Sequence, residues 1–187
     1  MKKLLLMLFV LPFMVACVTD GKTGGNTVTD SDTIVVDTIN DASKVVVGTV
    51  GEGTTMHMLE LVTDDDSLYY FDYENNVIGG LVAGDVVNVL YEETDGVTSA
   101  FVITNLSALS HLWALADTDG KQHLELNDGG NATVFGMDID YDHWDVYAGK
   151  LVLKHMTEAD TLNITLLTED SLIVEGKSET IKMFREN

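Results

Sequence analysis

Five histidines and a single cysteine are the residues of this chain best suited to metal binding or nucleophilic chemistry. Metal sites often contain histidines paired at short spacing in the sequence. The histidines here are far apart, and no His-x-His, His-x-x-x-His or Glu-x-x-His pattern occurs. We therefore expect no metal site and no cofactor. The histidines are His57, His111, His123, His143 and His155.

The segment Met56-His57-Met58 gathers soft ligands of the kind that bind copper(I). In a strand, however, neighbouring side chains point to opposite faces, so both methionines would lie on the face opposite His57. We expect the two methionines in a core and His57 in solvent, with copper binding as the alternative.

The segment Asp138-Ile139-Asp140-Tyr141-Asp142 begins like a calcium-binding loop. An EF-hand loop needs glycine at its sixth position and glutamate at its twelfth. Those positions hold His143 and Gly149, so the EF-hand pattern fails. If the segment is a strand, its three aspartates share one face, and we expect that face to be solvated. Loose calcium binding is the alternative.

The acidic composition excludes one class of function and weakens another. The chain has 10 Lys and Arg against 31 Asp and Glu, a formal net charge of −21. A nucleic-acid binder needs basic residues to neutralise phosphates, so no nucleic-acid partner is expected. No Gly-x-Ser-x-Gly nucleophile motif occurs. With 31 acidic residues some carboxylates must lie close together, so such a pair does not indicate a hydrolase site. We expect the protein not to be an enzyme.

The first residues carry the pattern of an export signal. Lys2 and Lys3 precede an apolar run over residues 4–16. This run is shorter than the roughly 20 residues that a membrane-spanning helix needs, so we interpret it as part of a signal peptide. It ends in Met-Val-Ala-Cys at residues 14–17, and this cysteine is the single one in the chain.

That ending resembles the lipobox of bacterial lipoproteins, with Met14 where leucine is usual. The resemblance implies removal of the signal peptide 1–16 and acylation of Cys17, with palmitate as a typical chain. More than one acyl chain anchors a protein stably, so we expect an outer-membrane lipoprotein on the periplasmic or the cell-surface face. The alternatives are a cleaved signal with an incidental cysteine and a short amphiphilic anchor. Residues 17–32, rich in Gly, Thr, Asn and Asp, are interpreted as a flexible tether.

From Thr33 onward the sequence predicts an all-β protein. Short β-branched and aromatic runs alternate with Gly, Asp and Asn clusters, and no stretch shows a 3.6-residue apolar stripe. The irregular stretch 73–81 is interpreted as a turn or a short helix. The order of strands in residues 33–109 predicts a small OB-like barrel. The expected strands are 44–50, 56–62, 68–71, 85–92 and 97–104.

Residues 110–187 predict a second antiparallel unit. Turn residues recur every 8 to 12 positions, which is typical of an up-and-down sheet or barrel. In residues 141–147 the alternation places Trp144 and Val146 on one face, which we expect to be the core face. The expected strands are 112–114, 122–126, 133–135, 141–147, 151–153, 162–167, 172–174 and 180–184.

The second unit contains an ordered set of short motifs: Trp113 in the opening strand, the turn segment 125–133, and segments 141–145, 149–153 and 167–172. In their order and spacing these motifs resemble the lipocalin-like domain of Bacteroidota lipoproteins. The sequence departs from the lipocalin Gly-x-Trp pattern in having His111 two residues before Trp113. The unit is also about half the length of a full lipocalin, so side chains would fill most of its interior.

Two functions fit this organisation. The first is a lipid-anchored envelope binding protein that holds a small apolar or amphipathic ligand at the mouth of the second barrel. The second is a non-enzymatic interaction lipoprotein that presents β-domains to envelope protein partners. An apolar pocket above roughly 300 Å³ favours the first, and an exposed apolar patch over a filled barrel favours the second. The candidate lining residues, each with a place in the core as its alternative, are Trp113, Phe135, Tyr141, Trp144 and Tyr147.

Overall fold

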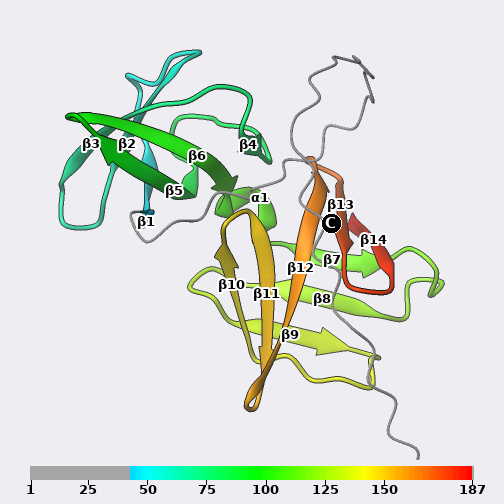
Figure 1. The fold of residues 1–187 in the computed structure, drawn as a ribbon. Coiled ribbons are helices and arrows are strands. Elements are labelled where there is room, and N and C mark those ends of the chain that lie inside the picture. The colour runs from blue at the N-terminus through cyan, green and yellow to red at the C-terminus, as the bar shows by residue number, and fades with distance from the viewer. Residues whose placement is uncertain (1–42, 187) are drawn as a thin grey trace, which may run out of the picture. The chain divides into compact units, whose positions relative to one another are not determined.

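The computed structural model describes residues 43–186. The expected signal peptide 1–16, the lipidation site Cys17 and the tether 17–32 lie outside the described residues. The described chain is almost entirely β, with fourteen strands and a single four-residue helix, α1 (Leu106–Leu109), between β6 and β7 (Figure 1). The predicted all-β class is therefore confirmed.

Five strands of the first half close into a small barrel. β1 pairs with β2 and β5, and β2 pairs with β3. β5 pairs with β6, and a parallel contact between Asp72 and Ser99 joins β3 to β6, which completes the ring. This closure by a parallel pair, with the other pairs antiparallel, is the predicted OB-like arrangement. The strands are β1 (Lys44–Val50), β2 (Met58–Val62), β3 (Leu68–Asp72), β5 (Val86–Thr94) and β6 (Val97–Asn105), with the short β4 (Val77–Ile78) beside β6.

Strand alternation fills the interior of this first barrel. Its inward side chains include Leu59 and Leu61 of β2, and Val87 and Val89 of β5, all fully buried. Gly48 lies where β1 passes close to β2, and a Cβ built there would stand 2.7 Å from the Val62 carbonyl oxygen. The absence of a side chain at Gly48 therefore permits the close approach of β1 to β2.

Eight strands of the second half form the other sheet. Consecutive strands pair antiparallel from β7 to β9 and from β10 to β14, and β14 returns to pair with β7. β9 and β10, at the two ends of the sheet, meet through a bridge between Asn131 and His143. The result is a nearly closed up-and-down barrel, as the lipocalin-like resemblance implies. The strands are β7 (Leu112–Leu115), β8 (His123–Leu126), β9 (Ala132–Phe135), β10 (His143–Tyr147), β11 (Lys150–His155), β12 (Glu158–Leu167), β13 (Ser171–Glu175) and β14 (Thr180–Arg185).

The short helix α1 and Trp113 belong to one end of the second barrel. Asn105 caps α1, since its side-chain oxygen accepts a hydrogen bond from the Ala108 N–H at 2.9 Å. Trp113 is fully buried, and its Nε1–H donates to the Leu109 carbonyl at 2.9 Å. The polar atom of the indole is thereby satisfied in the core, and this end of the barrel is filled.

The two barrels lie within one compact unit of the described chain. Leu90 of β5, Val102 of β6 and Ile78 of β4 belong to the hydrophobic cluster of the second barrel. The Asn88 side-chain N–H₂ also donates to the Val146 carbonyl at 3.3 Å. The outer face of β5 and β6 is therefore buried against the second barrel.

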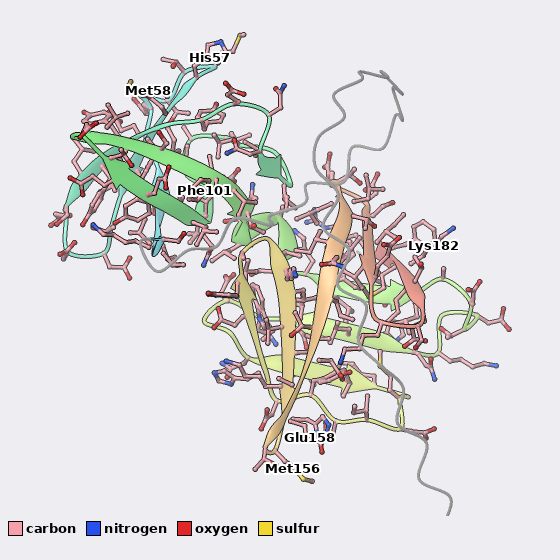
Figure 2. All side chains as sticks on the ribbon, viewed as in Figure 1. His57, Met58, Phe101, Met156, Glu158 and Lys182 are labelled. Carbon is pink, nitrogen blue, oxygen red and sulfur yellow. The ribbon has the colours of Figure 1, made fainter. Side chains whose placement is uncertain are left out.

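The expected burial of Met56 and Met58 in a core is wrong. β2 begins at Met58, and the buried side chains of this strand belong to its two leucines. Met58 therefore lies on the outer face, and Met56 precedes the strand with 80% of its surface exposed. His57 is exposed, as expected, and projects from the first barrel (Figure 2).

Two further local expectations differ from the structure. The stretch 73–81 contains β4 and no helix, and the helix falls at 106–109, where Asn105 supplies a cap. Residues 138–142 form the connection before β10 and not a strand, so their three aspartates share no strand face. The mixed polarity of both stretches gives no periodicity from which a sequence argument can choose.

Candidate functional site

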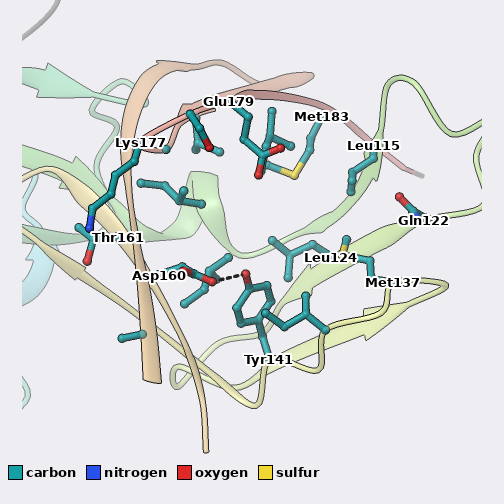
Figure 3. Close-up of a pocket in the computed structure, with 18 of the residues that line it drawn as sticks. Leu115, Gln122, Leu124, Met137, Tyr141, Asp160, Thr161, Lys177, Glu179 and Met183 are labelled. Carbon is teal, nitrogen blue, oxygen red and sulfur yellow. Dashed lines mark hydrogen bonds between the residues drawn. The ribbon is translucent and has the colours of Figure 1, made fainter. Parts of the chain in front are cut away.

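A cavity of about 540 Å³ lies at one end of the second barrel (Figure 3). Alternate connections of an up-and-down barrel emerge at the same end. Here these are the connections β7–β8, β9–β10, β11–β12 and β13–β14, and residues next to or within each of them line the cavity. Met156 and Glu158 lie at the tip of the β11–β12 hairpin at this end (Figure 2). The opposite end carries α1, so the cavity belongs to the open end.

The wall of the cavity is aliphatic. Inward positions alternate with outward ones along each strand, so Val174 of β13 faces inward while its neighbour Ile173 faces outward. Opposite Val174 on the next strand is Ile181, and Met183 follows two residues later on the same face. The aliphatic and methionine side chains of the wall are Leu115, Leu124, Met137, Ile139, Leu153, Leu162, Val174, Ile181 and Met183.

Tyr141 is the aromatic residue of the cavity lining. Its Oη–H donates to Asp160 Oδ2 at 2.6 Å (Figure 3), and its ring meets that of His155 edge to face, with centroids 6.1 Å apart. Asp160 pairs with Leu153, whose side chain is buried in the barrel, so Asp160 shares the inward face. The hydrogen bond therefore connects the β9–β10 connection to the first residues of β12 across the mouth.

The electrostatic environment of Tyr141 is negative. Burial raises the pKa of its phenol above the ordinary value, and the hydrogen bond to Asp160 adds to the rise, as do the charges of Asp160 and Glu179. Tyr141 is therefore protonated at neutral pH and acts as a hydrogen-bond donor. Since both carboxylates influence the same phenol, they act on a common region of the mouth.

The remaining polar groups of the lining lie at the rim. The acidic residues are Asp138, Asp160 and Glu179, and the only Lys or Arg among the lining residues is Lys177. In Figure 3 the Lys177 side chain extends towards Thr161 and away from Glu179. The cavity thus combines an aliphatic wall with an acidic mouth.

The structure places the five predicted lining residues in different environments. Tyr141 lines the cavity. Trp113 and Trp144 are core residues, and the Trp144 Nε1–H donates to the Asn127 carbonyl at 2.9 Å. Phe135 and Tyr147 point outward, with 48% and 52% of their surfaces exposed. A ligand-contacting role for Tyr141 stays a prediction, and the other four residues lie off the cavity lining.

The predicted lining residues are all aromatic, whereas the wall of the cavity is aliphatic. Every second residue of β11, β13 and β14 points inward, so the inward set could have been read from the alternation once the core face of each strand was fixed. The lining residues 137–139 and 176–179 could not be predicted in this way, because they lie in connections whose path has no sequence period.

A second hollow lies on the first barrel and is open to solvent. It measures about 690 Å³ and is lined mostly by polar residues, namely His57 and members of the segments 72–76 and 99–101. Only two large apolar side chains, Tyr73 and Phe101, contribute to it. It therefore lacks the continuous apolar wall that small-molecule sites usually have.

Across residues 43–186, no group of three or more His, Cys, Asp or Glu side chains is arranged to hold a metal ion. Within the same range, none of the helical structure has the length and apolar character of a bilayer-crossing segment.

Comparison with known proteins gives a partial structural likeness. Neither a protein-family model nor a curated protein matches the sequence. A lipocalin-like protein from Bacteroides thetaiotaomicron, of known crystal structure, is similar over 42% of this chain and 97% of its own length. The sequence identity is 23% and the TM-score is 0.36.

Proposed function

We propose that this protein binds a small apolar or amphipathic ligand in the open end of its second barrel. The cavity of about 540 Å³ carries the proposal, because it lies within the range of about 300–1,000 Å³ typical of small-molecule sites. Its aliphatic wall would accept an apolar chain, and the polar rim would hold the other end of the ligand. An eight-stranded barrel is wide enough to hold one small ligand.

A cavity-filling substitution tests the proposal. Val174 faces the cavity, so Val174→Phe should place its ring in the free space and weaken binding of the neutral fluorescent probe N-phenyl-1-naphthylamine at least about tenfold, roughly 1.4 kcal/mol. The matched control is Ile173→Phe, which adds a ring on the outer face of the same strand and should leave probe affinity unchanged.

Thermal unfolding of both variants would verify that each is folded. The proposal fails if the wild-type protein does not take up the probe, or if folded Val174→Phe binds it as tightly as the wild type does. Equal losses in the two variants would also contradict it, because the cavity would then not be the binding site.

We also propose that the chain is an outer-membrane lipoprotein anchored through acylated Cys17. The support is the sequence alone: Lys2 and Lys3, the apolar run 4–16 and the lipobox-like ending. In a bacterial host, Cys17→Ser should abolish incorporation of labelled palmitate and move the protein out of the outer-membrane fraction. Unchanged labelling, or retention in the membrane fraction with an uncleaved leader, would contradict the anchor.

A further inference from the structure

The mouth of the cavity is negatively charged, whereas its wall is apolar. Three carboxylates, Asp138, Asp160 and Glu179, line the cavity together with one cation, Lys177. They come from three separate parts of the chain: the β9–β10 connection, the start of β12 and the β13–β14 turn. The whole chain adds to the same sign, with a formal net charge of −21.

Asp160 places a negative charge at the mouth of the cavity. It lies on the inward face of β12 at the mouth, two residues before the buried Leu162. Asp138, Asp160 and Glu179 are all solvent-exposed, so their charges act at the mouth most strongly at low ionic strength. A ligand whose tail occupies the aliphatic wall would therefore hold its polar end within the field of Asp160 and Glu179.

An anionic head group is disfavoured at this mouth. A carboxylate or phosphate would approach two or three like charges, and like charges placed together in a binding site are destabilising. A cationic head would be attracted by the same groups and could form charge-assisted hydrogen bonds with them. The Tyr141 hydroxyl already donates to Asp160, and the remaining lone pairs of this carboxylate are acceptors for a further donor.

We propose that the cavity selects amphiphiles with a cationic head group, such as a protonated amine on an aliphatic chain, over those with an anionic head. This inference rests on the proposed function, since it assigns a ligand class to the same cavity. The tail would lie against Leu153, Val174 and Ile181, and the head would lie between Asp160 and Glu179.

Three probes with the same tail separate the head-group effect from the tail effect. Decylamine, decanol and decanoate would each displace N-phenyl-1-naphthylamine from the purified protein at pH 7 and low salt. We expect decylamine to bind at least about tenfold more tightly than decanoate, with decanol between them. Raising the salt concentration should narrow this difference, because added ions screen the rim charges.

Neutral variants assign the preference to the rim. The double variant Asp160→Asn with Glu179→Gln keeps side-chain shape and removes two charges, so it should reduce the preference for decylamine to within about threefold. The matched control is Glu169→Gln in the β12–β13 turn, at the opposite end of the barrel. It removes a charge far from the mouth and should leave the preference unchanged.

The outcomes distinguish this inference from the function on which it rests. If none of the three probes displaces the fluorophore, the binding proposal itself fails. If all three displace it but decanoate binds as tightly as decylamine, the cavity binds amphiphiles without the charge preference and the inference alone is overturned. An unchanged preference in the double variant, or an equal reduction in Glu169→Gln, would also overturn the inference.

Discussion

His111 lies beside Trp113 at the closed end of the second barrel, with the two ring centroids 6.0 Å apart. The pKa of His111 is lowered, first by burial and second by the positive charge of Arg185, while Asp128 opposes the shift weakly. The folded protein therefore resists protonation of this imidazole. When the chain unfolds, the imidazole regains its ordinary pKa near 6.5 and takes up a proton more readily.

This difference predicts a pH dependence of stability. Below about pH 6.5 the unfolded chain binds a proton at His111 that the folded chain does not, so stability falls as pH decreases through that region. His111→Gln removes this contribution, and its melting temperature should fall less than that of the wild type between pH 8 and pH 5.5. Thermal unfolding at the two pH values measures the effect, and parallel decreases in both proteins would contradict it.

At the scale of the strands, the sequence predicts most of the fold because the two faces of each strand have different polarity. The predicted strand 44–50 has the same first and last residues as β1. The turn residues Thr94-Asp95-Gly96 predict the hairpin of β5 and β6. Trp144 and Val146 were predicted to face the core, and both are buried. The error at β2 arose because residues 56 to 62 have apolar side chains at both even and odd positions, so alternation alone does not identify the core face.

The candidate site was harder to predict than the strands. Its wall follows from alternation, but its rim consists of turns brought together by closure of the barrel, with residues more than 35 positions apart such as Tyr141 and Glu179. Closure itself depends on β14 pairing with β7, a long-range contact that no local pattern specifies. Of the five aromatic candidates, Tyr141 lines the cavity. Phe135 and Tyr147 lie at the outward-facing positions of β9 and β10 and do not.

At the scale of the whole molecule, the two barrels share a buried contact. Leu90 lies on the outer face of β5, yet it is 1% exposed and packs in the cluster of the second barrel. Because the second barrel buries the Leu90 side chain, unfolding of either barrel would expose apolar surface of the other. The described chain should therefore unfold cooperatively.

Leu90→Ala tests this coupling. Truncation of a buried leucine typically costs about 2–5 kcal/mol, and we expect a single calorimetric transition at lower temperature. The control Leu68→Ala removes a side chain that is 51% exposed and should change stability by about 0.5 kcal/mol or less. Two separate transitions, or a shift confined to one of them, would show that the barrels unfold independently.

The seam between β9 and β10 is a sparsely paired boundary of the second barrel. Along the other boundaries a full ladder fixes the spacing of neighbouring strands, whereas this pair shares the bridge at Asn131 and His143 and a few backbone hydrogen bonds around it. Separation of β9 and β10 beyond this bridge would widen the interior of the barrel without breaking a continuous set of strand hydrogen bonds. Under the proposed function, ligands with branched or bulky hydrocarbon chains could therefore enter at little energetic cost. The barrel would then tolerate different hydrocarbon chains but discriminate between head groups by their charge.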